Sequence, residues 1–286
     1  MTYYLSRSPV HTIVGGVRGL YRLVGFAAVF AGLSVIAVAF RALMPTSVPV
    51  ARRVALRRWI GRRLTRACGV RIARSGFVPH HLVMLVSNHL SWVDSFIYMA
   101  ESGARFVAER AYAVPVLRTV LASAGVIFVN RSRLRDAPRA GRAVKRACDR
   151  GEPVIVFPEA DTSRGATVLP FRGALLESMA RSEVGVSYAA ISYQTPPGWP
   201  PASVAVCWAD WTPLLLHVYR TFHPPWIAAR IRYGREPVVA HDRKALASEL
   251  HAQVSLMFDP MPQMAREELA RIHVPQTRSP APPARP

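Results

Sequence analysis

The stretch Ser87-Asn88-His89-Leu90-Ser91-Trp92-Val93-Asp94 sets the predicted fold, because it joins a strand to a helix through a polar turn. Residues 82–86, which precede it, are apolar and typical of a buried strand. Ser91 and Asp94 have the spacing of a helix N-cap with its capping box. The sequence therefore predicts a strand, a tight turn that carries His89, and a helix that begins near Ser91.

His89 and Asp94 are five positions apart, so on one continuous helix their side chains would point away from each other. Across a strand-to-helix turn the two side chains can converge. A carboxylate beside an imidazole fixes its tautomer and stabilises the imidazolium, which is the arrangement of a general base. The pattern indicates a catalytic pair; the alternative is an ordinary capping box beside a His that binds a backbone carbonyl.

Beyond this turn, apolar runs typical of strands alternate with runs typical of helices. The predicted strands are residues 82–86, 126–130, 154–157, 186–193, 204–208 and 227–233. The predicted helices are residues 92–101, 114–123, 137–149, 174–182 and 243–258. This alternation predicts an α/β domain over residues 51–274, with a mixed, mostly parallel sheet flanked by helices. Residues 275–286 are rich in proline, and we expect them to form a disordered tail.

The N-terminal part contains an uncharged run, residues 23–40, between Arg22 and Arg41. As a helix this run would be ~27 Å long, about the thickness of the hydrocarbon core of a bilayer. Several Gly and Ala residues lower its hydrophobicity, so a spanning helix and a helix that dips into one leaflet both stay open. We expect residues 1–50 to be a membrane-attachment segment.

The chain is strongly basic, since 37 Lys and Arg against 17 Asp and Glu give a formal net charge of +20. A basic collar in residues 51–74 contains Arg52, Arg53, Arg57, Arg58, Arg62, Arg63, Arg66, Arg71 and Arg74. More arginines follow the apolar run than precede it, which predicts a bacterial-type inner membrane with the catalytic domain on the cytoplasmic face. We expect the collar to contact anionic lipid rather than nucleic acid, because no nucleic-acid recognition module accompanies it. The alternative is a solvated helix.

Two further strands end in polar residues. Residues 125–131, Gly-Val-Ile-Phe-Val-Asn-Arg, place Arg131 at the carboxyl end of a strand, where ligands gather in α/β sheets. Arg is suited to forked binding of phosphate or carboxylate. Residues 154–165, Val-Ile-Val-Phe-Pro-Glu-Ala-Asp-Thr-Ser-Arg-Gly, bring a second polar group to such an edge. A surface arginine and a solvated turn are the alternatives.

Other chemistries have weaker support. The Asp161-Thr162-Ser163 run lacks the Gly of an aspartic-protease turn, and no second Asp-Thr-Gly exists. No Gly-x-Ser-x-Gly elbow indicates a serine hydrolase. The three cysteines are scattered and have neither a disulfide framework nor zinc-ligand spacing.

Taken together, three stretches in this order and spacing resemble the lysophospholipid acyltransferase family, whose type member is 1-acylglycerol-3-phosphate O-acyltransferase. They are Asn-His-x4-Asp, Gly-x-Ile-Phe-Val-x-Arg and Phe-Pro-Glu-x-x-x-Ser, and the resemblance covers about residues 55–235. It implies a glycerolipid acyltransferase-like fold, with His89 as general base and Asp94 as its partner. The substrate-binding residues are then expected to be Arg131, Glu159, Thr162, Ser163 and Arg164.

The implied reaction moves a fatty acyl group from acyl-CoA or acyl carrier protein to the free hydroxyl of a lysolipid. The first expected acceptor is 1-acylglycerol-3-phosphate, which would give phosphatidic acid in phospholipid biosynthesis. Backbone amides near residues 88–90 or at Gly165 are candidates for holding the oxyanion. The scheme needs no metal and no cofactor apart from the donor substrate.

The third block departs from the family pattern, which usually reads Phe-Pro-Glu-Gly-Thr, often with Arg next. Ala160, Asp161 and Thr162 stand at those positions, so phosphate binding would need Arg164 or Arg172. This block looks similar to members that acylate lyso-ornithine lipid, and a lyso-ornithine lipid O-acyltransferase therefore stays open. A membrane-bound thioester or ester hydrolase and a non-catalytic membrane-binding protein are the remaining alternatives.

Overall fold

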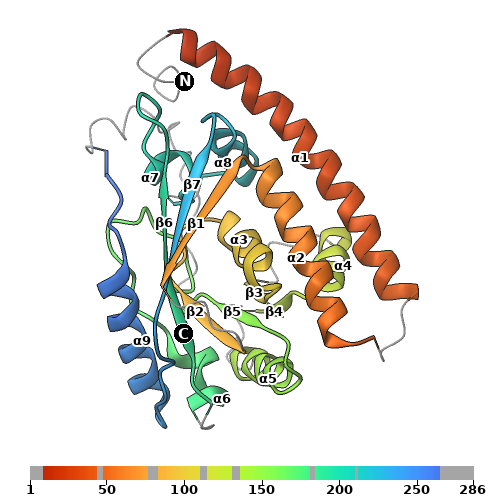
Figure 1. Cartoon of the computed structure of the whole chain (residues 1–286), viewed down its shortest axis with the longest axis vertical. Helices are drawn as coiled ribbons and strands as arrows, with labels where there is room; N and C mark the ends of the chain where they lie inside the picture. The colour runs from red at the N-terminus through yellow and green to blue at the C-terminus, as the bar shows by residue number, and fades with distance from the viewer. Residues whose placement is uncertain are drawn as a thin grey trace, which may run out of the picture.

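The structure, a computed structural model, describes residues 9–43, 48–76, 83–109, 115–130, 136–180, 184–209 and 212–264. In this part of the chain a seven-stranded sheet lies between two groups of helices, and a long N-terminal helix runs along the flank (Figure 1). The mixed, mostly parallel sheet flanked by helices is confirmed.

The sheet has the strand order β1-β7-β6-β2-β5-β3-β4. Its strands are β1 (Val70–Gly76), β2 (Met84–Ser87), β3 (Arg105–Glu109), β4 (Ile127–Val129), β5 (Val154–Val156), β6 (Ser187–Gln194) and β7 (Ile227–Tyr233). Every neighbouring pair is parallel except β6 and β7. Strands β2 and β5 are buried along their whole length, which explains their uninterrupted apolar sequence.

The helices are α1 (Pro9–Leu43), α2 (Val50–Ala67), α3 (Val93–Ser102), α4 (Pro115–Ser123), α5 (Asp136–Asp149), α6 (Glu177–Ala180), α7 (Ala202–Ala205), α8 (Leu214–Thr221) and α9 (Arg243–Met257). The predicted helices 92–101, 114–123, 137–149 and 243–258 are confirmed as α3, α4, α5 and α9. The predicted helix 174–182 is divided into a 3-10 turn, Gly173–Leu175, and the short α6.

The predicted strand 204–208 is wrong, because residues 202–205 form α7. Pro201 lies at the N-cap, and its carbonyl accepts hydrogen bonds from the amides of Val204 and Ala205. The apolar run after it is buried, but by packing of a helical turn and not by strand pairing. Two strands were also unpredicted: β1 overlaps the end of the basic collar and pairs with β7, and β3 begins and ends with charged residues.

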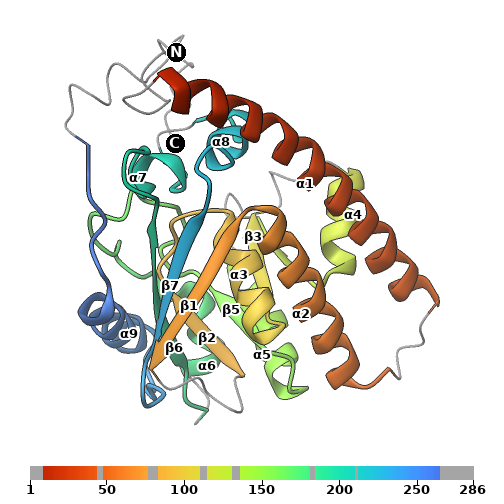
Figure 2. The same ribbon diagram turned by 45° about the horizontal axis from the view of Figure 1, so that its top comes forward.

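Helix α1 is longer than the predicted apolar run, and its segment Ile13–Leu43 is long and apolar enough to cross a membrane by length and composition. It packs on α2, α4 and α8 along the flank of the domain (Figures 1 and 2). Its inner face carries Phe26, Phe30 and Leu33, which join the domain core. Its outer face exposes apolar side chains, among them Ile13, Val17, Leu20, Val24 and Val35.

One arginine of the collar is part of the protein interior. The Arg57 Nη1 atom lies 3.1 Å from the Glu152 carboxylate, and Arg57 Nε donates to the carbonyl of Gly103 at 2.7 Å. Burial lowers the pKa of Arg57 to about 10. Arg57 therefore ties α2 to the turns before β3 and β5, whereas Arg62 and Arg66 on the same helix are exposed.

Candidate active site

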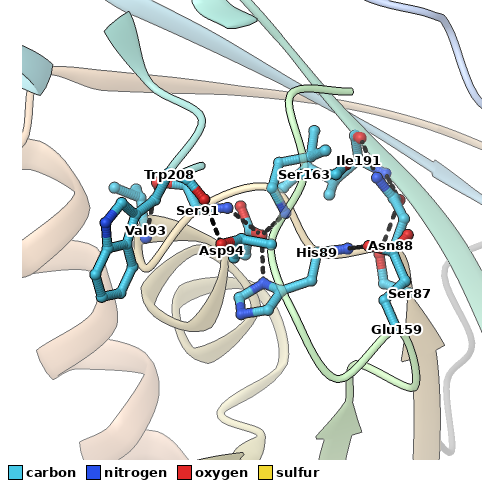
Figure 3. Close-up of polar contacts among 12 residues, drawn as sticks. Ser87, Asn88, His89, Ser91, Val93, Asp94, Glu159, Ser163, Ile191 and Trp208 are labelled. Carbon is cyan, nitrogen blue, oxygen red and sulfur yellow. Dashed lines mark hydrogen bonds and ion pairs between the residues drawn. The ribbon is translucent and has the colours of Figure 1, made fainter. Parts of the chain in front are cut away.

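The turn after β2 is fixed by one side-chain amide. Asn88 donates from Nδ2 to the carbonyl of Ile191 (2.9 Å), and its Oδ1 accepts from the Ile191 amide (2.8 Å). This paired contact attaches the buried turn to β6 just beyond the last residue of β2 (Figure 3). The next residue, His89, is thereby held at the carboxyl end of the parallel strands, which is where α/β sheets bind ligands.

His89 and Asp94 converge across the turn, as predicted. His89 Nδ1 lies 2.7 Å from Asp94 Oδ2, and the same oxygen accepts from the amides of Leu90 (2.7 Å) and Ser91 (2.9 Å) (Figure 3). Asp94 is fully buried, whereas 19% of the His89 side chain is exposed. Since Nδ1 is bound to the carboxylate, Nε2 is the nitrogen left to exchange a proton with a substrate.

The predicted capping box is only half formed. Asp94 accepts from the Ser91 amide, but the Ser91 hydroxyl is 3.5 Å from the amide of Val93, and Trp92 is the N-cap of α3. The Asp94 carboxylate binds both the imidazole of His89 and the two backbone amides of the turn. The general-base arrangement therefore describes the geometry better than the alternative of an isolated cap beside an unrelated His.

Tyr193 binds the second oxygen of Asp94, and this role was not predicted from the sequence. Its hydroxyl, buried on β6, donates to Asp94 Oδ1. Burial, followed by the nearby Asp94 carboxylate, raises the pKa of Tyr193 well above its ordinary value, so the hydroxyl stays protonated and remains a donor. The only signal in the sequence was a polar-tipped residue within the otherwise apolar predicted strand 186–193.

We expect Tyr193→Phe to lower the turnover number about tenfold, because one charge-assisted hydrogen bond that positions Asp94 is lost. The KM should change little, since Tyr193 touches Asp94 and not the exposed side of His89. Steady-state kinetics of acyl transfer on the purified full chain measure both. Tyr219→Phe, on α8, is the matched control, since the Tyr219 ring packs on His223 and not on Asp94. Equal turnover in the Tyr193→Phe and Tyr219→Phe proteins would contradict a positioning role.

Glu159 binds the backbone of the His89 turn. It is only 3% exposed, and its carboxylate oxygens accept from the backbone amides of His89 (3.2 Å) and Leu169 (3.2 Å). The His89 ring also stacks on Phe157, with 4.1 Å between ring centroids. The structure thus gives Glu159 a contact that positions the turn; its predicted contact with the acceptor head stays a prediction.

Burial raises the pKa of Glu159 to about 8, although the two backbone amides oppose this shift. Between about pH 4.5 and 8 the Glu159 carboxyl is ionised in the unfolded chain but protonated in the folded chain. The free energy of unfolding should therefore fall as the pH rises through this range. We expect Glu159→Gln to reduce this fall by roughly 2–5 kcal/mol. Urea unfolding at both ends of this pH range measures it, with the exposed Glu236→Gln as control. Identical pH slopes in wild type and Glu159→Gln would refute the assignment.

Residues 162–164, in the stretch that follows β5, also contact segments around the His89 turn. The Ser163 amide donates to the His89 carbonyl at 3.2 Å, and the Thr162 hydroxyl donates to the Trp208 carbonyl (Figure 3 for Ser163 and Trp208). The Arg164 carbonyl accepts from Gln263 at 3.0 Å. The structure therefore brings Ser163 into contact with His89, whereas Thr162 and Arg164 form hydrogen bonds with Trp208 and Gln263. Arg131 lies outside the described residues, so its predicted role stays a prediction.

Ala160 has a left-handed backbone, with φ of 62°, at the position where the family pattern has Gly. A side chain in this conformation costs about 1–2 kcal/mol relative to Gly. We expect Ala160→Gly to stabilise the protein by about 1 kcal/mol in chemical denaturation. Ala174→Gly, in the 3-10 turn at 173–175 where φ is negative, should destabilise it instead. A loss of stability in Ala160→Gly would show that the strain argument is wrong.

Three of the backbone amides that the sequence suggested for the oxyanion, those of His89, Leu90 and Gly165, are already bound. The His89 amide donates to Glu159, the Leu90 amide to Asp94, and the Gly165 amide to the Ser163 hydroxyl. None of these three is free to hold an oxyanion in this conformation. As for metals, the described ranges contain no group of three or more His, Cys, Asp or Glu side chains that could bind one.

Comparisons with known proteins agree with this geometry. Residues 69–194 match the family model described as Acyltransferase, a range that contains His89, Asp94 and Glu159. The 1-acyl-sn-glycerol-3-phosphate acyltransferase of Neisseria meningitidis is 34% identical over 137 residues, which are 47% of this chain and 54% of that protein. The lyso-ornithine lipid O-acyltransferase of Pseudomonas aeruginosa is 29% identical over 174 residues, 60% of this chain and 67% of that protein.

The chain thus matches about half of the length of the first of these relatives. Among solved structures, the 1-acyl-sn-glycerophosphate acyltransferase from Thermotoga maritima is similar with a TM-score of 0.52 and 17% sequence identity. The superposition covers 83% of this chain and 96% of that one. This similarity shows that the two proteins share a fold.

Proposed function

We propose that this chain, whose residues 69–194 match the Acyltransferase family model, transfers a fatty acyl group from a thioester donor to the free hydroxyl of a lysolipid. The observation that carries the proposal is the contact of His89 Nδ1 with the buried Asp94 carboxylate, 2.7 Å long. A partly exposed imidazole held in this way can take the proton of an alcohol. The donor is acyl-CoA or acyl carrier protein.

In this mechanism, His89 Nε2 removes the proton from the lysolipid hydroxyl as the oxygen attacks the thioester carbonyl. The tetrahedral intermediate then collapses, the carbon–sulfur bond breaks, and the thiolate leaves with the proton that the imidazolium returns. Asp94 keeps its charge throughout and stabilises the imidazolium. The hydroxyl hydrogen thus ends on the thiol, and an ester replaces the thioester.

We expect the protein to work on the cytoplasmic face of a bacterial inner membrane. Support comes from the exposed apolar face of α1 and from the exposed arginines of the collar, which suit anionic lipid. Because the inner face of α1 packs on α2, α4 and α8, its outer face is the one that would contact the hydrocarbon. This arrangement favours a helix lying in one leaflet against the domain over a helix that crosses the bilayer alone.

The first expected acceptor is 1-acylglycerol-3-phosphate, and one observation favours lyso-ornithine lipid as the second. Thr162 stands where many family members have Arg, and its hydroxyl is used in a hydrogen bond to the Trp208 carbonyl. The exposed Asp161 adds a negative charge beside it. A phosphate head would meet this carboxylate unfavourably, whereas an ornithine head offers an ammonium group. The negative charge of this loop therefore disfavours the phosphate head and favours the ornithine head.

The test is acyl transfer by the full chain reconstituted in vesicles, with labelled acyl-CoA or acyl carrier protein as donor. Lysophosphatidate and lyso-ornithine lipid are offered separately as acceptors. Transfer to either acceptor supports the proposal, and the preferred one names the substrate. Release of free fatty acid without transfer would support the hydrolase alternative instead. No lipid product with either donor would leave only the non-catalytic alternative and overturn the proposal.

A further inference from the structure

A cavity of about 740 Å³ lies away from the His89 turn, between the end of α1, helices α4 and α5, and the edge strand β4. Its volume is in the range of small-molecule sites, roughly 300–1,000 Å³. Apolar side chains, including Val38, Phe128 and Ala143, form part of its wall. A ligand with both an apolar and a polar portion would therefore fit this lining.

Arginine is the most frequent polar residue in the wall. The charged residues that line it are Arg41, Arg105, Arg118, Arg139, Arg146 and Asp136. Arg139 is 3.8 Å from Asp136, and Arg105 donates to the Gly125 carbonyl and lies near Glu152. No ion pair within the described ranges neutralises Arg41, Arg118 or Arg146. Three guanidinium groups on three different helices thus face one space, and the carboxylate that also lines it, Asp136, is paired with Arg139 and not with them.

This cavity is separate from the catalytic turn. Two strands, β5 and β3, lie between β2 and β4 in the sheet. The cavity is lined by Arg105 and Ile127, which are the first residues of β3 and β4, whereas His89 follows the last residue of β2. In parallel strands these positions are at opposite ends of the sheet. A ligand bound here is neither the acceptor nor the reacting end of the donor.

The cavity adjoins the surface that would contact lipid. Arg41 belongs to the last turn of α1, next to the exposed apolar side chains of Val35, Ile36 and Leu43. A helix that lies in one leaflet sits at the boundary between head groups and acyl chains, so an arginine at its end reaches the level of the lipid head groups. The occupant that suits both the charge and this position is a lipid with an anionic head.

We propose that this cavity binds the phosphate of an anionic phospholipid, and that Arg41 of α1, Arg118 of α4 and Arg146 of α5 hold it. Guanidinium groups bind phosphate oxygens in pairs, and the apolar wall accommodates the glycerol and the first methylenes. The bound lipid would fasten the end of α1 to the α/β domain. The site is independent of acyl transfer and requires only that α1 contact the membrane.

The experiment titrates the full chain, in neutral detergent, with soluble dihexanoyl phosphatidylglycerol and follows binding by calorimetry. The cavity variant is Arg118→Gln with Arg146→Gln. The matched control is Arg62→Gln with Arg66→Gln, which removes the same charge from positions of α2 that are exposed, like Arg118 and Arg146, but do not line the cavity. We expect the cavity variant to bind about tenfold or more weakly, and the control to change less than about threefold. Thermal unfolding confirms that both variants are folded.

Two further ligands separate the sources of binding. Dihexanoyl phosphatidylcholine, which carries no net charge, should bind at least about tenfold more weakly than phosphatidylglycerol, and so should inorganic phosphate. Equal losses in the cavity and collar variants would overturn the proposal in favour of a diffuse charge effect. Equal affinity for inorganic phosphate would overturn it in favour of a site for free phosphate. Because binding needs no turnover, a negative acyl-transfer assay has no bearing on either result.

Discussion

The His89→Ala protein should lose about 10²–10⁴-fold in the rate of acyl transfer while remaining folded. The loss follows because Nε2 of His89 is the group that accepts the hydroxyl proton in the proposed mechanism. The fold should survive, because the buried Asp94 still accepts from the amides of Leu90 and Ser91 and from the Tyr193 hydroxyl. No buried polar group is left without a partner by this substitution.

The measurement is the initial rate of lysolipid acylation at saturating donor, for wild type and variant in the same vesicles. His241→Ala is the matched control, since His241 is exposed and lies before α9, far along the chain from the turn. Thermal unfolding of the three proteins should agree within a few degrees. A His89→Ala protein with more than about a tenth of the wild-type rate would exclude His89 as the general base.

The catalytic pair could be predicted because it depends on local geometry. His89 and Asp94 belong to one strand-turn-helix unit, and the apolar run before it and the carboxylate after it were both visible in the sequence. The parallel core strands β2 and β5 were predictable for a similar reason, since burial on both faces gives uninterrupted apolar runs. Long helices with clear ends, such as α5 and α9, were predicted with boundaries close to those observed.

The features that were not predicted from the sequence depend on contacts between distant segments of the chain. Tyr193 is 99 positions from Asp94, and no spacing rule connects the two. Strand β1 forms because Val70–Gly76 pairs with Ile227–Tyr233. Its exposed arginines interrupt the apolar pattern by which a strand is predicted. Glu159 was predicted to bind the acceptor, and its hydrogen bond from the His89 amide, 70 positions away, was not predicted. Sequence patterns report which faces are apolar, but not which buried polar groups meet.

Two substitutions at Asp94 should have different effects, because this carboxylate has both a catalytic and a structural role. In Asp94→Asn the amide oxygen can take the place of Oδ2 and keep the bonds from Leu90, Ser91 and His89. Its NH₂ group would then donate to the Tyr193 oxygen, since a hydroxyl both donates and accepts. The reversed amide would orphan two buried backbone N–H groups and is therefore disfavoured.

We expect Asp94→Asn to remain folded and to lose about 10²–10⁴-fold in turnover, since a neutral amide does not stabilise the imidazolium. Asp94→Ala should instead unfold readily, because it leaves the amides of Leu90 and Ser91 and the Tyr193 hydroxyl buried and unpaired, at about 1–3 kcal/mol each. Turnover and urea unfolding of both variants separate the two roles. Near wild-type turnover in Asp94→Asn would mean that the negative charge is unnecessary, and the His89–Asp94 mechanism would then have to be abandoned. Equal stability of the two variants would show that the carboxylate does not hold the turn, because only the alanine removes its hydrogen-bond acceptor.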